Sequence, residues 1–304
     1  MITAVAIPIV NTMSADEAEV VDFCCASCGI AEVDDVKLKN CADCDLVRYC
    51  CDSCRQDHKP KHEVSCRERA AALRDEVLFR QPESSHLGDC PICLLPLPID
   101  TEQPVYFTCC SKVICQGCSC AISSQTEEQV ECPCPFCRED IRKSDKNQNI
   151  LKRVAANDPV ALQEMGMDRF QEGNYVDAFE YWTKASEMGD AESHLRLSLL
   201  YWRGRGVEKD EKKEIYHLEE AAIAGHPDAR YMLASYEWES GRIDRAVKHW
   251  IIAVNLGHEQ SMQALKLFYA AGKISKDQFD AALRANHAAI DAMKSPQREA
   301  AKSV

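Results

Sequence analysis

Cysteine occurs in only one part of this chain, and this distribution constrains the fold more than any other feature. All 19 cysteines lie between Cys24 and Cys137 of the 304 residues, and the remaining C-terminal portion has none. Many form pairs separated by two residues, a spacing that lets two thiolates reach one tetrahedral zinc ion from a tight turn. The segregation indicates metal sites rather than a disulfide framework.

The stretch from Cys90 to Cys137 supplies eight thiols at ligand spacing. It reads CPIC at 90–93, TCCSKVICQGC at 108–118 and CPFCR at 134–138. Such half-sites would complete two closed structural zinc sites. A segment this short cannot bury enough apolar surface to fold alone, and zinc binding of roughly 10 to 16 kcal/mol in finger peptides is the usual substitute. We therefore expect this unit to be unfolded without metal.

These residues resemble a RING domain of the all-cysteine type. The usual histidine after the third ligand is absent, and Lys112 stands in its place, but Cys110 has the spacing to Cys115 that some RING variants use. The resemblance implies two interleaved zinc sites. Their ligands would be Cys90, Cys93, Cys115 and Cys118 for one ion, and Cys109, Cys110, Cys134 and Cys137 for the other.

A second cluster of ligands precedes this stretch. It contains CASC at 25–28, CADC at 41–44 and YC at 49–50, followed by Cys54, His62 and Cys66. Eight ligands would hold two more zinc ions, and tetrahedral coordination fixes the ligand number but not which pairs share an ion. His58 is a rival to His62, which has the H-x3-C spacing to Cys66.

The order of this cluster resembles the MYND-type zinc finger, in which alternating pairs share a metal. The resemblance favours interleaved sites over sequential ones: Cys25, Cys28, Cys50 and Cys54 on one ion, and Cys41, Cys44, His62 and Cys66 on the other. The chain would then bind four Zn2+ ions. The four cysteines left over are interpreted as small buried or surface thiols: Cys24, Cys51, Cys120 and Cys132.

The pattern changes from about Asp158, where alanine, leucine, glycine and aromatic residues recur at helical spacing. Gly189, Gly225 and Gly257 mark an internal period, and Leu197, Leu233 and Leu265 follow them at a constant offset. Such a period predicts stacked helical pairs, each ending at its glycine. The segment GRGVEKD at 204–210 resembles the Sel-like repeat, a relative of the tetratricopeptide repeat. We expect a fourth pair, from 258 to about 293, with a longer second helix.

We therefore predict a multidomain chain with two small zinc-stabilised cross-brace fingers followed by an all-α helical-repeat solenoid. The predicted parts are a flexible tail at 1–21, a MYND-like finger at 22–68, a helical linker at 69–87, a RING-like finger at 88–142, a linker at 143–157, Sel-like repeats at 158–294 and a tail at 295–304.

Charge and hydropathy argue against other classes of function, although a local basic patch such as Lys59 and Lys61 could still bind nucleic acid. The net charge of −13 opposes binding to nucleic acid phosphates, and no apolar run approaches the roughly 20 residues of a membrane helix. The first ten residues lack the basic start of a signal peptide. We expect an intracellular protein of the cytoplasm or nucleus, without a membrane partner.

The RING resemblance implies a ubiquitin ligase, which needs no nucleophile because it positions a charged conjugating enzyme. Ile92 and Pro135 would form the docking surface for that enzyme, and Arg138 would contact ubiquitin and its carrier. Turn geometry alone also explains a proline in a CPxC sequence. The main expectation is a ligase whose MYND-like finger and repeats recruit protein substrates. The alternative is a non-enzymatic adaptor that binds protein or peptide partners.

Overall fold

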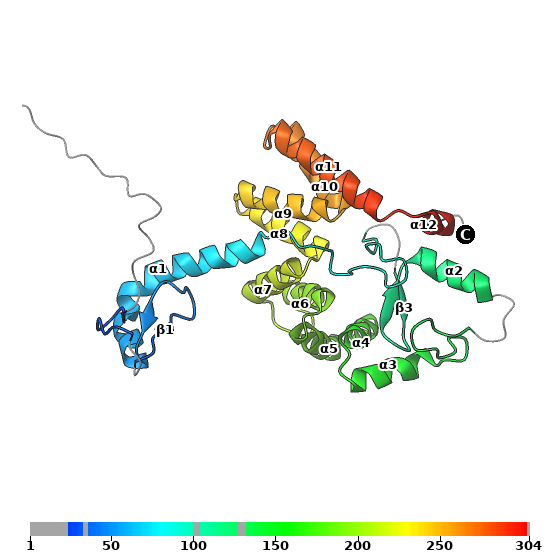
Figure 1. Cartoon of the computed structure of the whole chain (residues 1–304), viewed down its shortest axis with the longest axis horizontal. Helices are drawn as coiled ribbons and strands as arrows, with labels where there is room; N and C mark the ends of the chain where they lie inside the picture. Colours follow the sequence, from blue (N-terminus) through cyan, green and yellow to red (C-terminus); the bar gives the residue numbers. More distant parts are fainter. Residues whose placement is uncertain (1–23, 33–35, 100–103, 127–131, 303–304) are drawn as a thin grey trace, which may run out of the picture. The chain divides into compact units, whose positions relative to one another are not determined.

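The computed structural model describes residues 24–32, 36–99, 104–126 and 132–302 (Figure 1). The tail expected at 1–21 lies outside these residues. The chain divides into two compact units, residues 1–77 and 78–304. No helix in the described part of the chain is long and apolar enough to cross a membrane.

The first unit combines a short hairpin with one long helix. Strands β1 (Lys39–Asn40) and β2 (Arg48–Tyr49) pair antiparallel, and α1 spans Asp52–Leu78. The sequence predicts a separate linker helix, whereas the structure has one helix that begins inside the finger. Pro60 does not interrupt it. The core of this unit consists of one tyrosine and the cysteine cluster, so little apolar surface is available to stabilise it without metal.

The second unit starts with the second cysteine-rich module (residues 88–142, hereafter the second module). Strands β3 (Val105–Phe107) and β4 (Lys112–Ile114) form an antiparallel hairpin, and α2 (Gln116–Thr126) follows. Leu97, Phe107 and Ile114 pack among the thiols. The next helix, α3 (Lys146–Ala155), lies where the sequence predicts a linker, because its polar sequence still buries Asn149 and Ile150 on one face.

Eight helices then form four successive pairs (Figure 1). The first helix of each pair is α4 (Pro159–Gln171), α6 (Ala191–Arg203), α8 (Pro227–Glu239) or α10 (Glu259–Ala270), and the second is α5 (Tyr175–Glu187), α7 (Glu211–Ile223), α9 (Ile243–Asn255) or α11 (Lys276–Ala292). Each helix packs against its neighbours in chain order. The prediction of cysteine-rich zinc-site clusters followed by a stacked helical region is confirmed.

The sequence period corresponds to the helix ends and the core. Gly189, Gly225 and Gly257 follow α5, α7 and α9 with φ of 86°, 86° and 93°, a conformation that glycine adopts without strain. The leucines of the period, Leu197, Leu233 and Leu265, are at most 3% exposed. α11 is the longest of the eight helices, as expected.

The tail predicted at 295–304 is instead a helix along most of its described length. α12 (Pro296–Ala301) begins at Ser295, whose hydroxyl accepts a hydrogen bond from the Arg298 backbone. α12 packs against α2 so closely that a Cβ at Gly117 would lie 2.7 Å from the Arg298 nitrogen. The helix forms because Arg298, only 2% exposed, is buried against the second module.

Candidate metal centres and binding surfaces

Four of the CxxC pairs are presented by turns of the same geometry: Cys25–Cys28, Cys41–Cys44, Cys90–Cys93 and Cys134–Cys137. In each turn, the residue after the second cysteine donates its backbone N–H to the carbonyl of the first cysteine, over 2.8 to 3.1 Å. That residue has positive φ in every case: Gly29, Asp45, Leu94 and Arg138. The turn therefore directs both thiols of a pair to one side, as a shared metal ion requires.

The first unit brings its ligands together as two interleaved tetrads. In each tetrad, one ligand atom per residue lies within 4.8 Å of the others: Cys25, Cys28, Cys50 and Cys54 in the first, and Cys41, Cys44, His62 and Cys66 in the second. Cys54, His62 and Cys66 lie on α1, whereas the CxxC pairs come from the loops before it. This is the arrangement that the MYND resemblance implies.

His62 and His58 have different surroundings. The Nε2 of His62 lies 3.1 Å from the Cys44 sulfur. His58 directs its Nδ1 to the Tyr49 hydroxyl at 3.1 Å and stacks on His62. The structure therefore places His62 with the thiols and gives His58 a packing role beside them.

The second module brings its eight thiols together in the same interleaved way. One set contains Cys90, Cys93, Cys115 and Cys118, and the other contains Cys109, Cys110, Cys134 and Cys137, again within 4.8 Å. The sulfur of Cys110 lies 3.7 Å from the sulfur of Cys134. The four remaining cysteines belong to none of the tetrads among the described residues: Cys24, Cys51, Cys120 and Cys132.

The thiols of these tetrads have opposing tendencies to ionise. Burial acts to raise the pKa of Cys25, but hydrogen bonds from the backbone N–H groups of Cys28 and Cys50 outweigh it and bring this pKa to about 6. In contrast, burial and hydrogen bonds to Cys44 and Cys41 raise the pKa of Cys66 to about 12. Neighbouring thiols in a tetrad cannot all ionise without repelling one another, and a bound divalent cation would remove this repulsion.

The donor sets fit zinc. Three tetrads consist of cysteines alone and one combines three cysteines with a histidine, which are the compositions of closed structural zinc sites. A closed tetrahedral site has no position for a reacting water, so the chemistry available to these centres is structural. Zinc would crosslink loops that have almost no other core.

The three residues expected to contact a conjugating enzyme are exposed. Ile92 is 41% exposed, and Pro135 and Arg138 also lie at the surface. The positive φ of Arg138, 65°, belongs to the turn geometry shared by all four pairs, and one of the others has glycine there. The turn therefore accounts for the conformation at this position, but not for an arginine side chain.

A groove on the helical stack combines aromatic and acidic side chains. It has a volume of about 500 Å3 and is bordered by the end of α6, the start of α7 and one side of α8. We call it the acidic groove, because four carboxylates and a single lysine line it; the lining residues are Tyr201, Trp202, Lys209, Asp210, Glu211, Glu214, Met232, Ser235, Tyr236 and Glu239. Trp202 is 52% exposed, although it is the largest apolar side chain of the groove.

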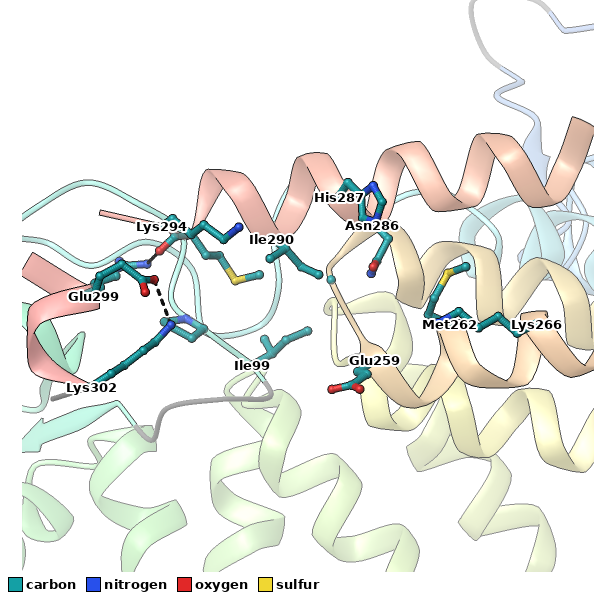
Figure 2. A pocket seen from close by; sticks show the side chains of 14 residues that line it. Ile99, Glu259, Met262, Lys266, Asn286, His287, Ile290, Lys294, Glu299 and Lys302 are labelled. Carbon is teal, nitrogen blue, oxygen red and sulfur yellow. Dashed lines mark hydrogen bonds and ion pairs between the residues drawn. The ribbon is translucent and has the colours of Figure 1, made fainter. Parts of the chain in front are cut away.

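A smaller cavity of about 300 Å3 lies between the last helices and the loop after β-bridge residue Pro96 (Figure 2). Met262 and Lys266 enter it from α10, and Asn286 and Ile290 from α11, as Figure 2 shows. Lysines around it are engaged with carboxylates: Lys302 binds Glu299 at 3.0 Å and Lys294 binds Asp291 at 2.8 Å. These two lysines therefore each form an ion pair with a carboxylate three residues earlier in the chain.

Sequence reasoning missed two side-chain clusters. One contains His86, Glu192 and His226, whose ligand atoms lie within 4.8 Å of one another. His226 could have been singled out from the sequence, because a polar residue directly follows each repeat glycine: Asp190, His226 and His258. The other is the set of hydrogen bonds around Arg298, which lacks such a signal.

Comparison with known proteins identifies the first finger and leaves the remainder without a named family. Residues 25–66 match the family model of the MYND finger, which is a zinc-binding module. No curated protein matches the chain. The type of the two all-cysteine clusters at 90–137 is not assigned by these matches.

Two solved structures are similar to the chain. One is a Sel1 repeat protein from Oxalobacter formigenes, with 23% identity over 49% of this chain and 66% of the other, and a TM-score of 0.41. The second is a protective antigen of uropathogenic Escherichia coli with an SLR fold, with 19% identity over 52% of this chain and 35% of the other, and a TM-score of 0.37. The chain spans less than two thirds of the length of either structure.

Proposed function

We propose that this chain is a zinc-stabilised adaptor, in which the MYND finger and the helical repeats bind protein partners without catalysing a reaction. The observation that carries this proposal is the acidic groove, where a half-exposed tryptophan lies beside crowded carboxylates. Tryptophan exposed in a groove is typical of residues that dominate protein interfaces. The proposal corresponds to the alternative that the sequence analysis raised.

The charges of the groove favour a basic partner segment. Burial and the neighbouring charge of Glu211 raise the pKa of Glu214, so these carboxylates repel one another. An incoming lysine or arginine side chain would relieve this repulsion. The Trp202 ring already has the Arg203 guanidinium 5.2 Å from its centroid, so the apolar part of the partner segment would lie against the remaining surface of the ring. A partner segment with one basic and one apolar residue would therefore match both the carboxylates and the aromatic surface of the groove.

The finger offers a second surface. Ile30, Leu46 and Val64 are 50%, 43% and 58% exposed around the two tetrads. Zinc fixes the loops that carry the first two residues, so the surface depends on metal. A partner that binds here would bind only the metal-loaded protein.

Quantitative affinity capture from cells tests this function. The full chain is compared with Trp202→Ala, with Cys44→Ser and with Leu267→Ala; the last removes a 71% exposed side chain on α10, away from the groove, and serves as a matched control. We expect Trp202→Ala and Cys44→Ser to lose different sets of partners and Leu267→Ala to lose none. Identical partner sets for all four proteins would refute the adaptor.

A ubiquitin ligase is the second candidate, favoured by the joint exposure of Ile92, Pro135 and Arg138 on a module with two complete tetrads. This candidate requires a conjugating enzyme as partner. The packing of α12 weighs against it, because Arg298 binds the carbonyls of Leu95 and Pro96, close to Ile92, and α12 covers part of α2. Discharge of ubiquitin from a charged conjugating enzyme separates the two candidates.

A further inference from the structure

Neighbouring helical pairs are joined by a recurring contact between a histidine and a carboxylate. His226 precedes α8, and its Nε2 lies 2.8 Å from a carboxylate oxygen of Glu192 in the previous pair. His258 precedes α10, and its Nε2 lies 2.9 Å from Asp228 in the same way. Both histidines are at most 2% exposed. The recurrence indicates that a histidine directly after the repeat glycine has a structural role, which is to join one helical pair to the previous pair.

The two histidines differ at the other ring nitrogen. The Nδ1 of His258 bonds to the Ser261 hydroxyl at 2.8 Å. At the equivalent place after His226 the chain has Ala229, and the Nδ1 of His226 has no hydrogen-bond partner among the described residues. A buried polar nitrogen without a partner is destabilising, because it has lost its hydrogen bond to water and gained none in return. One ring nitrogen of His226 is therefore without a hydrogen bond among the described residues, whereas both ring nitrogens of His258 have partners.

A third side chain, from outside the repeats, is held at this incomplete contact. The ring of His86 stacks on that of His226, with centroids 3.9 Å apart and an interplanar angle of 12°. Its backbone N–H donates to the Gly225 carbonyl at 3.1 Å, and a Cβ at Gly225 would lie 2.7 Å from the Ser84 carbonyl oxygen. Glycine thus permits the close approach that brings His86 to the cluster.

The Nδ1 of His86 is also buried without a hydrogen-bond partner among the described residues. Glu192 uses its other carboxylate oxygen for Arg196, at 2.6 Å, which fixes the orientation of the carboxylate toward His226. One ligand atom each from His86, Glu192 and His226 lies within 4.8 Å of the other two. Two imidazoles and a carboxylate are a common ligand set for zinc and related transition metals.

We propose that His86, Glu192 and His226 bind a divalent transition metal ion of the Zn2+ class, separate from the four tetrads. To coordinate the ion, the two rings would turn out of the stack, because the lone pair of an imidazole nitrogen lies in the plane of its ring; the carboxylate would be the third ligand. Burial, and to a smaller extent the neighbouring His226, lowers the pKa of His86 to about 3, so the His86 ring is neutral and able to coordinate at neutral pH. Bound metal would fasten the segment before the second module to the helical stack.

Metal content of the full chain at equilibrium tests the site. The chain is dialysed against buffered micromolar free Zn2+, and bound zinc per chain is measured for wild type, His86→Ala, Glu192→Gln and His226→Ala. His258→Ala is the matched control, because it removes the same kind of inter-repeat histidine without a third ligand. We expect each of the first three variants to bind one zinc ion fewer than wild type and the control to bind the same number.

Substitution with Co2+ identifies which kind of site is lost. Thiolate-to-cobalt charge-transfer bands report the tetrads, whereas histidine and carboxylate ligands contribute only weaker visible bands. We expect His86→Ala and Glu192→Gln to bind one Co2+ ion fewer and to lose a small part of the visible absorption, while the thiolate charge-transfer bands stay unchanged. Equal zinc content in wild type and both variants would overturn the proposal and leave a packed pair of neutral rings. A zinc loss accompanied by weaker charge-transfer bands in both would equally overturn it, since the ion would then belong to a tetrad.

Discussion

Leu233 illustrates how a single side chain supports the helical stack. It is 3% exposed and packs in one apolar cluster with Leu78, Leu195 and Leu218. Leu78 lies at the end of α1, so this cluster joins the repeats to the segment before the second module. Truncation would leave a cavity that the neighbouring helices cannot fill.

We expect Leu233→Ala to lower the free energy of unfolding by roughly 2 to 5 kcal/mol, the usual range for a large-to-small change in a core. Glu211→Ala is the comparison, because its carboxylate is exposed and accepts only a surface hydrogen bond from Tyr236; we expect about 0.5 kcal/mol or less. Thermal or denaturant unfolding measures both. Equal shifts would contradict the assignment of Leu233 to the core position of the repeat.

Residue positions that follow a period could be predicted from the sequence, and those that depend on distant segments could not. The glycines and leucines of the repeats recur at constant offsets, which reflect the helix ends and the core. His86 and Arg298 have no such regularity. Each has its role through a contact with a residue more than a hundred positions away in the sequence, and such a contact cannot be predicted from one sequence alone.

At the scale of elements, the hairpins and helices of the cysteine-rich units are held by their tetrads. We expect Cys54→Ala to disturb the Cys25–Cys28 turn more than the Cys41–Cys44 turn, because Cys54 shares a tetrad with the first pair. Cadmium-substituted protein reports this directly through metal-to-cysteine NMR couplings. Couplings that join both CxxC turns of the finger to one ion would contradict the interleaved arrangement.

Helix α12 is a structural part of the second module as well as the end of the chain. The guanidinium of Arg298 donates to the Cys93 sulfur at 3.3 Å, the Leu95 carbonyl at 3.2 Å and the Pro96 carbonyl at 2.7 Å. Hydrogen bonds from a charged donor contribute about 1.5 to 3 kcal/mol each. The metal tetrad containing Cys93 is therefore supported from the opposite end of the sequence.

We expect Arg298→Ala to accelerate zinc transfer to a chelator from one of the four tetrads and to lower the melting temperature. Arg284→Ala, which removes an exposed arginine from α11, should change neither. Stopped-flow release with a chromogenic chelator measures the effect. Release curves that superimpose for wild type and both variants would show that α12 does not support the metal site.

At the scale of the whole molecule, metal and apolar burial stabilise different parts. The tetrads lie between Cys25 and Cys137, whereas the buried residues of the repeat clusters are leucine, alanine, valine, isoleucine, methionine and tryptophan, without thiols. We expect a strong chelator to unfold the first unit and the second module of the full chain and to preserve most of the helical circular dichroism signal. A coil spectrum in chelator would contradict the independence of the repeats.

The order of the parts could be predicted because cysteine spacing and helical period are local patterns. The boundaries of the parts could not be predicted as well. α1 extends through the finger into the predicted linker, α3 occupies the second linker, and α12 replaces much of the C-terminal tail. For α12 the reason is a contact that is distant in the sequence, because Arg298 binds residues 93, 95 and 96.

The measurement that tests the central claim most directly is single-turnover discharge of ubiquitin from charged conjugating enzymes to free lysine. The metal-loaded full chain is compared with Ile92→Ala and Arg138→Ala, each checked for zinc content, across a broad panel of conjugating enzymes. The adaptor predicts that wild type discharges no faster than background with every enzyme and that the two variants do not differ from it. Discharge by wild type that is lost in Ile92→Ala through weaker docking, and slowed in Arg138→Ala with docking intact, would contradict the adaptor and establish a ligase.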